Sequence, residues 1–477
     1  MRKTILSALP LTLALAAAYP GAALAQSNED LLKELRALRD RVGQLEDKLK
    51  AAEAKPVPAV AAVPAAATAQ WGMTPAQASE FNRISVKTEA IEDSTEAMGL
   101  KNLKISGFID PTFIYNNAAN TSGFQLLSKL PYAYDNSYFG MAVLDLQKEM
   151  EGGTKWHLTL APERGAGAGF NSSSIVHEAS VSIPLGDLQT RLWLGQIPDW
   201  TGYEITLPTG NKLITHNLLF DFTAPTGYTG AVLDLTMGKW MVKAGLANVN
   251  AAHKSMGNKS PSLIYRVDYA KGEYNGFGFT GLHGKAYNYA ADATDGMGDL
   301  RFAGDAQRDT RVDLLEADVY FIRGDWTMQA QVSWGKQSKS ALFNEDGQLR
   351  DATWTGLSTL LAYKFIPRWE ATTRFDYLNN SKNGGGLFGY SSEDGHNGIG
   401  RGNGFAWDEA NPNPALAGKG ADRYALTLGL SYLFNPNTIF KMEYRLDASN
   451  QAVFNNASDG SWQKRNHLFG SSVLVSF

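Results

Sequence analysis

One segment of the chain alternates apolar and polar side chains without a break: residues 326–334 read WTMQAQVSW. Residues 424–434, which read YALTLGLSYLF, keep a similar alternation. Successive side chains of a β-strand point to opposite faces, so both segments predict strands with one apolar face. In the first segment that face begins and ends with a ring, at Trp326 and Trp334. Rings at both ends of an apolar face are typical of strands that cross a bilayer, because aromatic side chains favour its two interfaces.

Similar alternation recurs from residue 103 to the end of the chain. We expect sixteen strands, at 103–115, 138–150, 154–162, 174–185, 189–197, 228–238, 239–248, 261–270, 274–287, 311–322, 325–337, 352–365, 368–378, 422–434, 437–447 and 464–477. Seven short connections alternate with eight long ones, which include 116–137, 198–227 and 379–421. Short turns at one rim and long loops at the other are typical of a closed barrel in an outer membrane. The predicted fold class is an all-β transmembrane barrel of about 16 antiparallel strands, preceded by a short N-terminal α-helical coiled coil.

The composition agrees with a barrel and excludes several other classes. Only 19% of the 477 residues are charged, 11% are aromatic and 47 are Gly, yet the mean hydropathy is −0.25. Beyond residue 25 we find no apolar run of the roughly 18 residues that a transmembrane helix needs. The lack of Cys excludes disulfides, thiolate metal sites and a lipid-acylated N-terminal Cys. A net charge of −4 gives no support for a nucleic-acid partner.

The first 25 residues have the parts of an export signal. Arg2 and Lys3 precede an apolar core at 5–17, and residues 23–25 supply small side chains before the expected cleavage site. We therefore expect residues 1–25 to be a signal peptide. Its removal takes two of the 44 basic residues, which leaves 42 against 48 acidic residues and a net charge of −6. The alternative is a retained membrane anchor.

A heptad segment follows, and we expect a coiled coil at 26–55. Six apolar residues spaced 4, 3, 4, 3 and 4 apart form its seam and are assigned to oligomerisation: Leu31, Leu35, Leu38, Val42, Leu45 and Leu49. An isolated helix of this length is marginal in water, which favours burial of the seam between copies of the chain. The alternative is a single amphipathic helix that lies on the barrel.

The remaining domain boundaries follow from Pro, Gly and the change of period. Residues 56–73 are rich in Ala and Pro and predict an extended linker. Thr74 and Pro75 are typical of an N-cap and a first helical position, and Gly99 of a helix end. We therefore expect a short helical connector at 74–100 and the outer-membrane barrel at 101–477.

Three short motifs carry a family resemblance: residues 103–108 read LKISGF, residues 195–199 read GQIPD and residues 202–204 read GYE. With these motifs the chain resembles Gram-negative outer-membrane porins of the phosphate-selective porin O/P superfamily. It resembles still more closely the uncharacterised proteobacterial β-barrel proteins that carry an N-terminal coiled coil. The chain has no closely spaced ladder of Lys and Arg, so phosphate selectivity is not carried over.

The resemblance implies a passive diffusion channel for small hydrophilic solutes or ions in the cell outer membrane. It also implies a homotrimer, surrounded by outer-membrane lipid, with the N-terminal helices in the periplasm. The last strand has alternating apolar residues and ends on Phe477, which resembles the signal that the barrel-assembly machinery recognises. The alternative function is a structural or anchoring barrel with an occluded lumen, whose coiled coil contacts periplasmic partners or the cell wall.

Strand register assigns a set of charged residues to the lumen wall. The expected pore-lining residues are Lys104, Asp110, Arg191, Lys243, Arg266, Asp268, Arg374, Asp376, Arg445 and Asp447. An Arg-x-Asp unit recurs at 266–268, 311–313, 374–376 and 445–447. Residues i and i+2 of a strand share a face about 6.5–7 Å apart, so each unit sets a cation beside an anion. One interpretation is a transverse field across a water-filled lumen, and the other is a salt-bridge lattice in the wall. The unit at 311–313 lies near a strand start, where the facing is not determined.

The third long loop, 198–227, is the candidate constriction. Its expected constriction residues are Asp199, Glu204, Lys212, His216 and Asp221. In general porins the third loop folds inward, and we extend that property to this chain by analogy. The alternative is a loop that covers a neighbouring protomer.

No pattern of catalytic residues is found. The seven His are scattered, without a His-x-His or His-Glu-x-x-His spacing. We therefore expect no enzyme, no catalytic residues, no metal site and no cofactor.

Overall fold

A computed structural model of the chain describes residues 74–127, 139–162, 174–250, 254, 258–288, 309–340, 350–380 and 421–477. The predicted signal peptide, the coiled coil at 26–55 and the linker at 56–73 lie outside these residues. The chain divides into two units, one of which contains residues 103–477 and the other residues 19–102.

The described part of the smaller unit is a single helix, α2 (Pro75–Ala97). Thr74 is its N-cap and forms a capping box with Gln77. The side chain of each residue accepts a hydrogen bond from the backbone N–H of the other. Gly99 follows the helix with a φ of +70°, the left-handed conformation that ends many helices. The helix therefore lies within the predicted connector at 74–100. No helix in the described residues is long and apolar enough to cross a membrane.

The larger unit is a β-barrel. Its wall consists of β1 (Leu103–Ile109), β2 (Thr112–Asn116), β3 (Thr121–Gln125), β4 (Ala142–Glu149), β5 (Lys155–Leu160), β6 (Val176–Pro184), β7 (Thr190–Pro198), β8 (Gly227–Met237), β9 (Trp240–Val249), β10 (Ser262–Gly272), β11 (Asn275–Tyr287), β12 (Asp309–Arg323), β13 (Trp326–Gln337), β14 (Ala352–Ile366), β15 (Trp369–Asn379), β16 (Arg423–Asn435), β17 (Thr438–Ser449) and β20 (Arg465–Ser476). A small hairpin of β18 (Phe454–Asn455) and β19 (Trp462–Gln463) lies between the last two of these.

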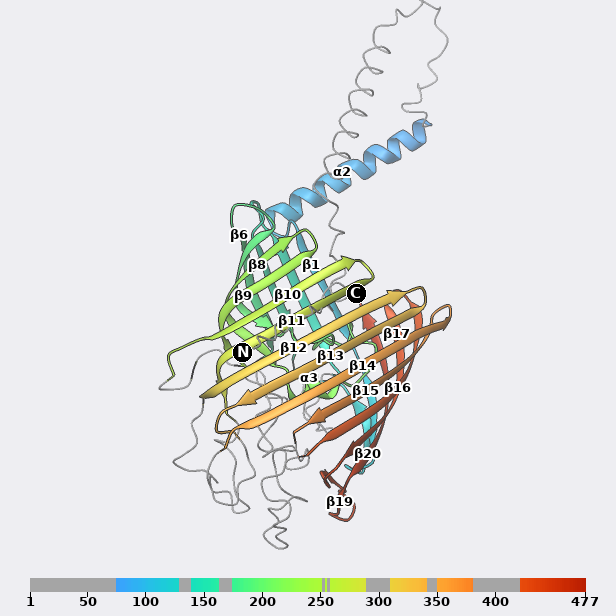
Figure 1. Cartoon of the computed structure of the whole chain (residues 1–477). Coiled ribbons are helices and arrows are strands. Elements are labelled where there is room, and N and C mark those ends of the chain that lie inside the picture. The colour runs from blue at the N-terminus through green and yellow to red at the C-terminus, as the bar shows by residue number, and fades with distance from the viewer. Residues whose placement is uncertain are drawn as a thin grey trace, which may run out of the picture. The chain divides into compact units, whose positions relative to one another are not determined.

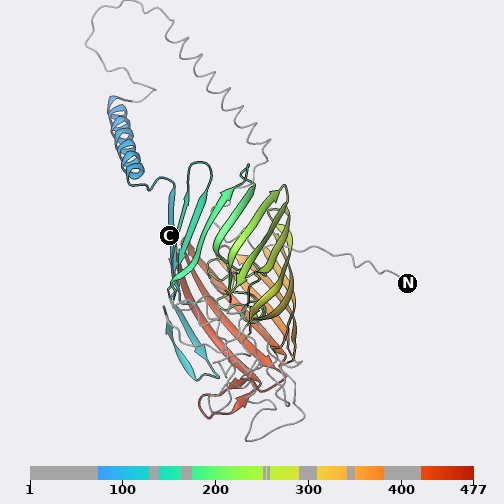
Figure 2. The ribbon, with the colours of Figure 1, turned by 90° about the vertical axis from the view of Figure 1, so that its left-hand side faces the viewer.

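Eighteen segments make sixteen barrel strands, because two strands are each interrupted once. β1 and β2 continue one another across Asp110 and Pro111, and both pair with β20. β3 pairs with β2, and β4 pairs with β1, so these two segments form the returning strand. Figure 2 shows the cyan β2–β3 hairpin at the lower left. The prediction of one long loop at 116–137 was wrong in this respect, since a tight turn at 117–120 and the strand β3 lie within it.

All neighbouring strands are antiparallel, and the last strand closes the barrel. β20 pairs with β17 on one side and with β1 and β2 on the other. The predicted closed barrel of 16 antiparallel strands is therefore confirmed. Its strands are tilted, as Figure 1 shows. We call the rim with the connections 238–239, 324–325 and 436–437 the turn rim, and the opposite one the loop rim.

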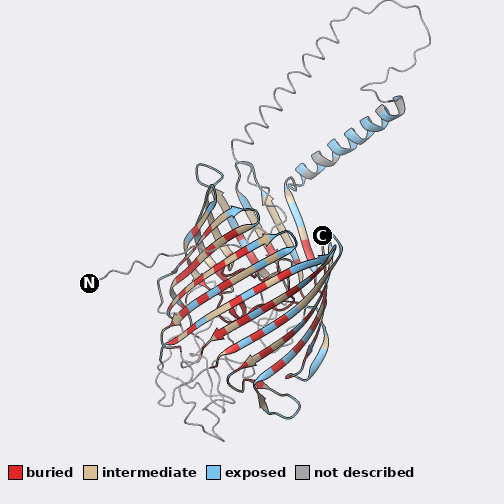
Figure 3. Ribbon diagram, turned by 45° about the vertical axis from the view of Figure 1, so that its right-hand side comes forward, coloured by how far each residue is buried: buried red, intermediate tan, exposed pale blue. Residues whose placement is uncertain are grey.

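Burial alternates along the strands, which Figure 3 shows as bands of red and pale blue. On β13 the outward Trp326, Met328, Val332 and Trp334 are 41–50% exposed, whereas the inward Gln331 is 2% exposed. Rings also pair across strands on the outer face, as Trp326 does with Tyr363 at a centroid distance of 4.2 Å. The apolar face thus points outward and the polar face inward, which is the reverse of a soluble protein.

Candidate functional site

Residues 199–226, which connect β7 to β8, fold into the barrel, and we call them the inner loop. They include a one-turn helix, α3 (Leu218–Phe222), in which all five residues are buried. The side chain of Asn217 caps this helix by accepting from Phe220 N at 2.8 Å. The capped turn presents a compact apolar surface to the barrel wall.

Two glycines of the wall allow the inner loop to lie close to it. A Cβ on Gly356 of β14 would be 2.0 Å from Leu219 Cδ2, and a Cβ on Gly429 of β16 would be 2.3 Å from Leu213 Cδ2. Both leucines are buried. The inner loop therefore fits the wall at positions where only Gly leaves room.

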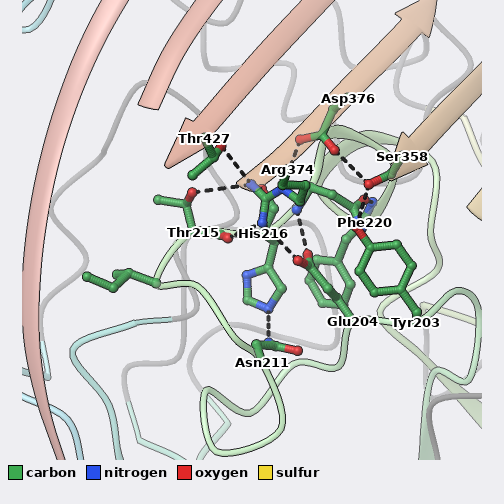
Figure 4. A network of polar contacts seen from close by, with 12 residues as sticks. Tyr203, Glu204, Asn211, Thr215, His216, Phe220, Ser358, Arg374, Asp376 and Thr427 are labelled. Carbon is green, nitrogen blue, oxygen red and sulfur yellow. Dashed lines mark hydrogen bonds and ion pairs between the residues drawn. The ribbon is translucent and has the colours of Figure 1, made fainter. Parts of the chain in front are cut away.

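Arg374 of β15 is the centre of a polar network between wall and inner loop (Figure 4). Its Nε donates to Asp376 Oδ2 at 3.0 Å, within the same Arg-x-Asp unit. Its Nη1 donates to Glu204 Oε1 at 2.8 Å and to Thr215 O at 2.7 Å. Its Nη2 donates to His216 O at 2.8 Å. One guanidinium thus holds the inner loop through a carboxylate and two backbone carbonyls, as the planar donor fork of Arg permits.

Arg445 of β17 repeats this arrangement. It donates to Asp447 Oδ1 at 2.8 Å and to His216 O at 2.6 Å. Asp221 of α3 lies 4.0 Å from the same guanidinium. Arg374 and Arg445 therefore share one carbonyl of the inner loop.

Arg266 of β10 holds the start of the inner loop. It donates to Asp268 at 2.8 Å, to Asp318 of β12 at 2.8 Å and to Trp200 O at 2.8 Å. All three of these arginines have side chains that are 0% exposed. Neither of the two interpretations of the Arg-x-Asp units anticipated this contact with the loop.

Other wall residues bind the inner loop where it lies nearest the turn rim. Glu443 of β17 accepts from Ile214 N at 2.6 Å and from the amide of Thr215 at 3.1 Å. Lys441 donates to Asn211 O at 2.7 Å. Lys212 of the loop donates to Glu370 of β15 at 2.8 Å. The wall thus holds the loop along its length with both charge signs.

The fourth Arg-x-Asp unit is different. Val312, between its two charged residues, is 0% exposed, and Arg311 is exposed. Arg311 and Asp313 therefore face outward, away from the lumen. The facing of this unit was left open by the sequence, and the structure shows it on the outer face because its strand parity is opposite to that of the other three.

Burial changes the acidity of the inner-loop groups. It raises the pKa of Asp199 to about 6, although Thr201 and Tyr228 donate hydrogen bonds to this carboxylate. Burial also raises the pKa of Glu204 and of Asp221, against the nearby arginines. Burial, together with the nearby charge of Arg374, lowers the pKa of His216 to about 3, although the hydrogen bond with Ile205 O opposes this shift. His216 is therefore neutral, in keeping with its Nε2 at 2.8 Å from Ile205 O and its ring stacked on Phe220.

The inner loop does not cover the wall of β4 to β8 to the same degree. On β5, His157 lies 2.5 Å from Asp145 of β4 and 3.0 Å from Glu178 of β6. The side chains of His157 and Asp145 are 16% and 17% exposed. Arg191 of β7 donates to Ser182 Oγ at 2.7 Å and is half-buried. Part of this wall thus keeps polar side chains in contact with solvent, although Thr159, Glu178 and Ser180 on the same strands are buried.

The other expected pore-lining residues lie at different depths. Lys104 is exposed near the turn rim. Asp110 is buried between β1 and β2, where it accepts from Gly140 N at 3.1 Å and from Ser472 Oγ. Lys243 Nζ lies 5.0 Å from the ring centre of Trp193 and 5.8 Å from that of Trp200. Asp110 thus joins strands, and Lys243 packs against rings.

The sequence did not indicate the uncharged polar groups that hold the inner loop by hydrogen bonds. Asn211 donates to Ile205 O at 2.6 Å, Tyr203 Oη lies 2.5 Å from Ser358 Oγ, and Asn217 N donates to Glu204 at 2.6 Å. Only Asn217 had a local signal, since an Asn before an apolar turn is a common N-cap. No group of three or more His, Asp or Glu in the described residues could hold a metal ion.

Fold and site together define a closed β-barrel with an apolar outer face and a loop bound across its lumen. A family model matches residues 1–477, so the chain belongs to the family described as "Protein of unknown function (DUF3138)". None of the curated proteins matches the chain.

Solved structures with a similar fold are outer-membrane proteins of low identity. One is an anion-selective porin from Comamonas acidovorans, with 12% identity, a TM-score of 0.48, and coverage of 79% of this chain and 99% of that one. Another is OmpT of Vibrio cholerae, with 9% identity, a TM-score of 0.48, and coverage of 79% and 97%. A third is the outer membrane channel DcaP of Acinetobacter baumannii, with 12% identity, a TM-score of 0.47, and coverage of 79% and 97%.

Proposed function

We propose that this protein is an outer-membrane channel for passive diffusion of small hydrophilic solutes or ions, narrowed by its inner loop. One observation carries the proposal: the inner loop is bound to the wall of β10 to β17, whereas polar groups such as Asp145 and His157 on the opposite wall stay solvent-accessible. This difference between the two walls supports a solute path along the wall of β4 to β8.

The outer face supports a membrane location. The apolar residues of β13 lie between Trp326 and Trp334, eight residues apart. At about 3.4 Å per residue and a tilt of about 40°, this band is roughly 21 Å tall, near the ~25 Å of outer-membrane barrels. The turn rim then faces the periplasm and the loop rim the exterior, as in barrels of this class.

The constriction is proposed to consist of Asp199, Glu204, Lys212, His216 and Asp221 with the wall arginines. In this proposal the Arg-x-Asp units at 266, 374 and 445 mainly hold the inner loop. They contribute to the electric field in the lumen only where the inner loop does not cover them. Glu204 and Asp221 are buried, so they position the loop rather than contact solutes.

A second candidate function, a structural barrel with an occluded lumen, is favoured by one specific observation. Eleven inward polar residues on β10 to β20 are 0% exposed among the described residues: Ser262, Arg266, Asp318, Ser358, Arg374, Asp376, Arg423, Thr427, Arg445, Asp447 and Asn466. Water does not reach them, so the lumen is filled on that side. Its coiled coil would then contact periplasmic partners or the cell wall.

Planar-bilayer recording of the refolded protein separates the two functions. A channel gives stepwise conductance with the native chain and a larger step with Arg374→Ala, which releases part of the inner loop. Arg311→Ala on the outer face is the matched control and should leave the step unchanged. Silence of the native chain, with steps only after Arg374→Ala, would establish the occluded barrel instead.

Assembly completes the proposal. We propose a homotrimer in outer-membrane lipid, inserted by the barrel-assembly machinery through the strand that ends on Phe477, with the N-terminal helices in the periplasm. The C-terminal strand supports this role because β20 closes the barrel.

A further inference from the structure

The outward Arg-x-Asp unit belongs to a charged cluster on the outer face of the barrel. Arg311 Nε donates to Asp313 Oδ2 at 3.1 Å, and His283 Nδ1 of β11 lies 2.9 Å from Asp313 Oδ1. Tyr265 Oη of β10 lies 3.2 Å from His283 Nε2. Three adjacent strands thus contribute polar groups to a face that is otherwise apolar.

Further cations surround this group. Lys285 pairs in register with Arg311, one step nearer the loop rim than the row of His283 and Asp313. Lys254, between β9 and β10, donates to the carbonyl oxygen of Lys285. The side chain of Arg311 is 72% exposed, and no ion pair holds the ammonium of Lys285 among the described residues.

Among the described residues, the acidic groups near these cations are engaged in ion pairs or hydrogen bonds. Lys336 of β13, in register with Asp313, is paired with Asp351 at 2.7 Å. Asp309 accepts from Asn258 Nδ2 at 3.2 Å. On β11 and β12, the described cations that face outward near the loop rim are Lys285 and Arg311, of which Arg311 is also paired with Asp313. We call these two residues the outer basic pair.

The height of the outer basic pair can be compared with that of the apolar band on the outer face. Trp334, the upper ring of the apolar band on β13, is in register with Leu315 of β12. Arg311 lies four residues beyond Leu315 toward the loop rim, which is about 10 Å along the barrel axis. The pair is therefore just outside the hydrocarbon level, where lipid headgroups lie.

We propose that the outer basic pair docks a phosphate of a phosphorylated glycolipid in the outer leaflet. The guanidinium and the ammonium supply charged donors that match phosphate oxygens, and basic groups beside a bilayer attract anionic headgroups. The apolar band directly below them accommodates the acyl chains. Because the pair sits on β11 and β12, with 13 and 15 residues among the longest strands of the wall, the lipid lies against a tall and continuous surface.

The test is native mass spectrometry of the full-length protein in mild detergent, with diphosphorylated lipid A or the same lipid after phosphate removal. The native barrel should retain the phosphorylated lipid, and Lys285→Gln with Arg311→Gln should bind it on the order of tenfold more weakly, as expected for charged hydrogen bonds. Arg323→Gln is the matched control, because Arg323 lies outward on the same strand at the opposite rim. It should bind like the native protein.

Two results would overturn the proposal: equal retention by the double variant, or equal retention of the lipid without phosphate. A changed subunit number with unchanged lipid binding would assign the surface to a second copy of the chain instead. Should the double variant fail to fold, Lys285→Gln alone provides the comparison, since its ammonium forms no ion pair within the part of the chain that the structure describes.

Discussion

Arg266, Arg374 and Arg445 face the lumen and are nevertheless fully buried. A buried guanidinium needs hydrogen-bond acceptors, and here carboxylates of the wall and carbonyl oxygens of the inner loop supply most of them. The sequence predicted that these residues point inward, from strand parity alone. It could not predict the loop contacts, because the partners are up to 230 positions away and share no local pattern with the strands.

Replacing Arg374 by Ala should loosen the inner loop without preventing barrel formation. The change removes the donor that Arg374 supplies to Glu204 Oε1 and to Thr215 O, whereas His216 O keeps its hydrogen bond from Arg445. Breaking a buried ion pair costs about 3–5 kcal/mol. Limited proteolysis at 199–226 should become faster, while heat-modifiable mobility on gels still reports a closed barrel. Arg311→Ala is the control, because the exposed ion pair that it removes is worth only about 0–1 kcal/mol. Equal cleavage of both variants would contradict the role of Arg374.

The acid dependence of inner-loop docking has two opposite contributions. His216 has its pKa lowered from 6.5 to about 3 in the docked loop, so a released loop takes up a proton first and docking weakens as the pH falls below 6.5. Asp199 has its pKa raised from 3.8 to about 6, so the docked loop takes up the proton first and docking strengthens as the pH falls through 6.

His216→Gln should isolate the first contribution. Above pH 7 the native protein and the variant should respond to pH in the same way. Between pH 6 and 4 docking in the native protein should become weaker relative to the variant, by up to about 1.4 kcal/mol per pH unit. The measurement is the rate of inner-loop proteolysis, with an acid-stable protease, at each pH. A difference that does not change with pH would show that the docked histidine is already charged.

At the scale of elements, strand number and position were predictable because lipid and water impose the period of two along every strand. The interruption of two strands near Asp110 and Gly140 was not predictable. It depends on hydrogen bonds from Gly140 and Ser472 to the Asp110 carboxylate, and these residues lie on different segments of the chain. The course of the inner loop was suggested only by analogy. Its fit depends on wall glycines, which a sequence pattern does not distinguish from ordinary strand glycines.

Substituting those glycines should displace the inner loop from the wall. Gly356→Val places a side chain where Leu219 now lies, and overpacking of this kind costs about 1–3 kcal/mol. Gly123→Val of β3 is the control, because nothing lies within 4 Å of a Cβ there. We expect lower thermal stability and faster cleavage at 199–226 for Gly356→Val alone. Equal behaviour of the two variants would show that the close approach is unimportant.

For the whole molecule, the N-terminal heptads predict a subunit contact apart from the barrel. Deleting residues 27–55 should weaken the proposed trimer without preventing insertion, because β20, which closes the barrel, lies far from the deleted residues. Native mass measurement of both proteins in mild detergent gives the subunit number. Replacing Leu38 and Leu45 by Ser should weaken the oligomer as the deletion does. Replacing Lys33 and Lys50 by Ser should leave the subunit number unchanged. A monomeric full-length protein would leave the helix as a tether.

The seam between the last strand and the first sets an order of events in folding. Asp110 accepts from Ser472 across 362 positions of the chain, so the seam forms only after synthesis is complete. Contacts of such separation form slowly, because the loop-closure entropy is lost before the contact is gained. The inner loop binds β17, the same strand that pairs with β20 at this seam. Barrel closure and loop docking thus depend on one strand, so we expect the two events to be coupled in folding.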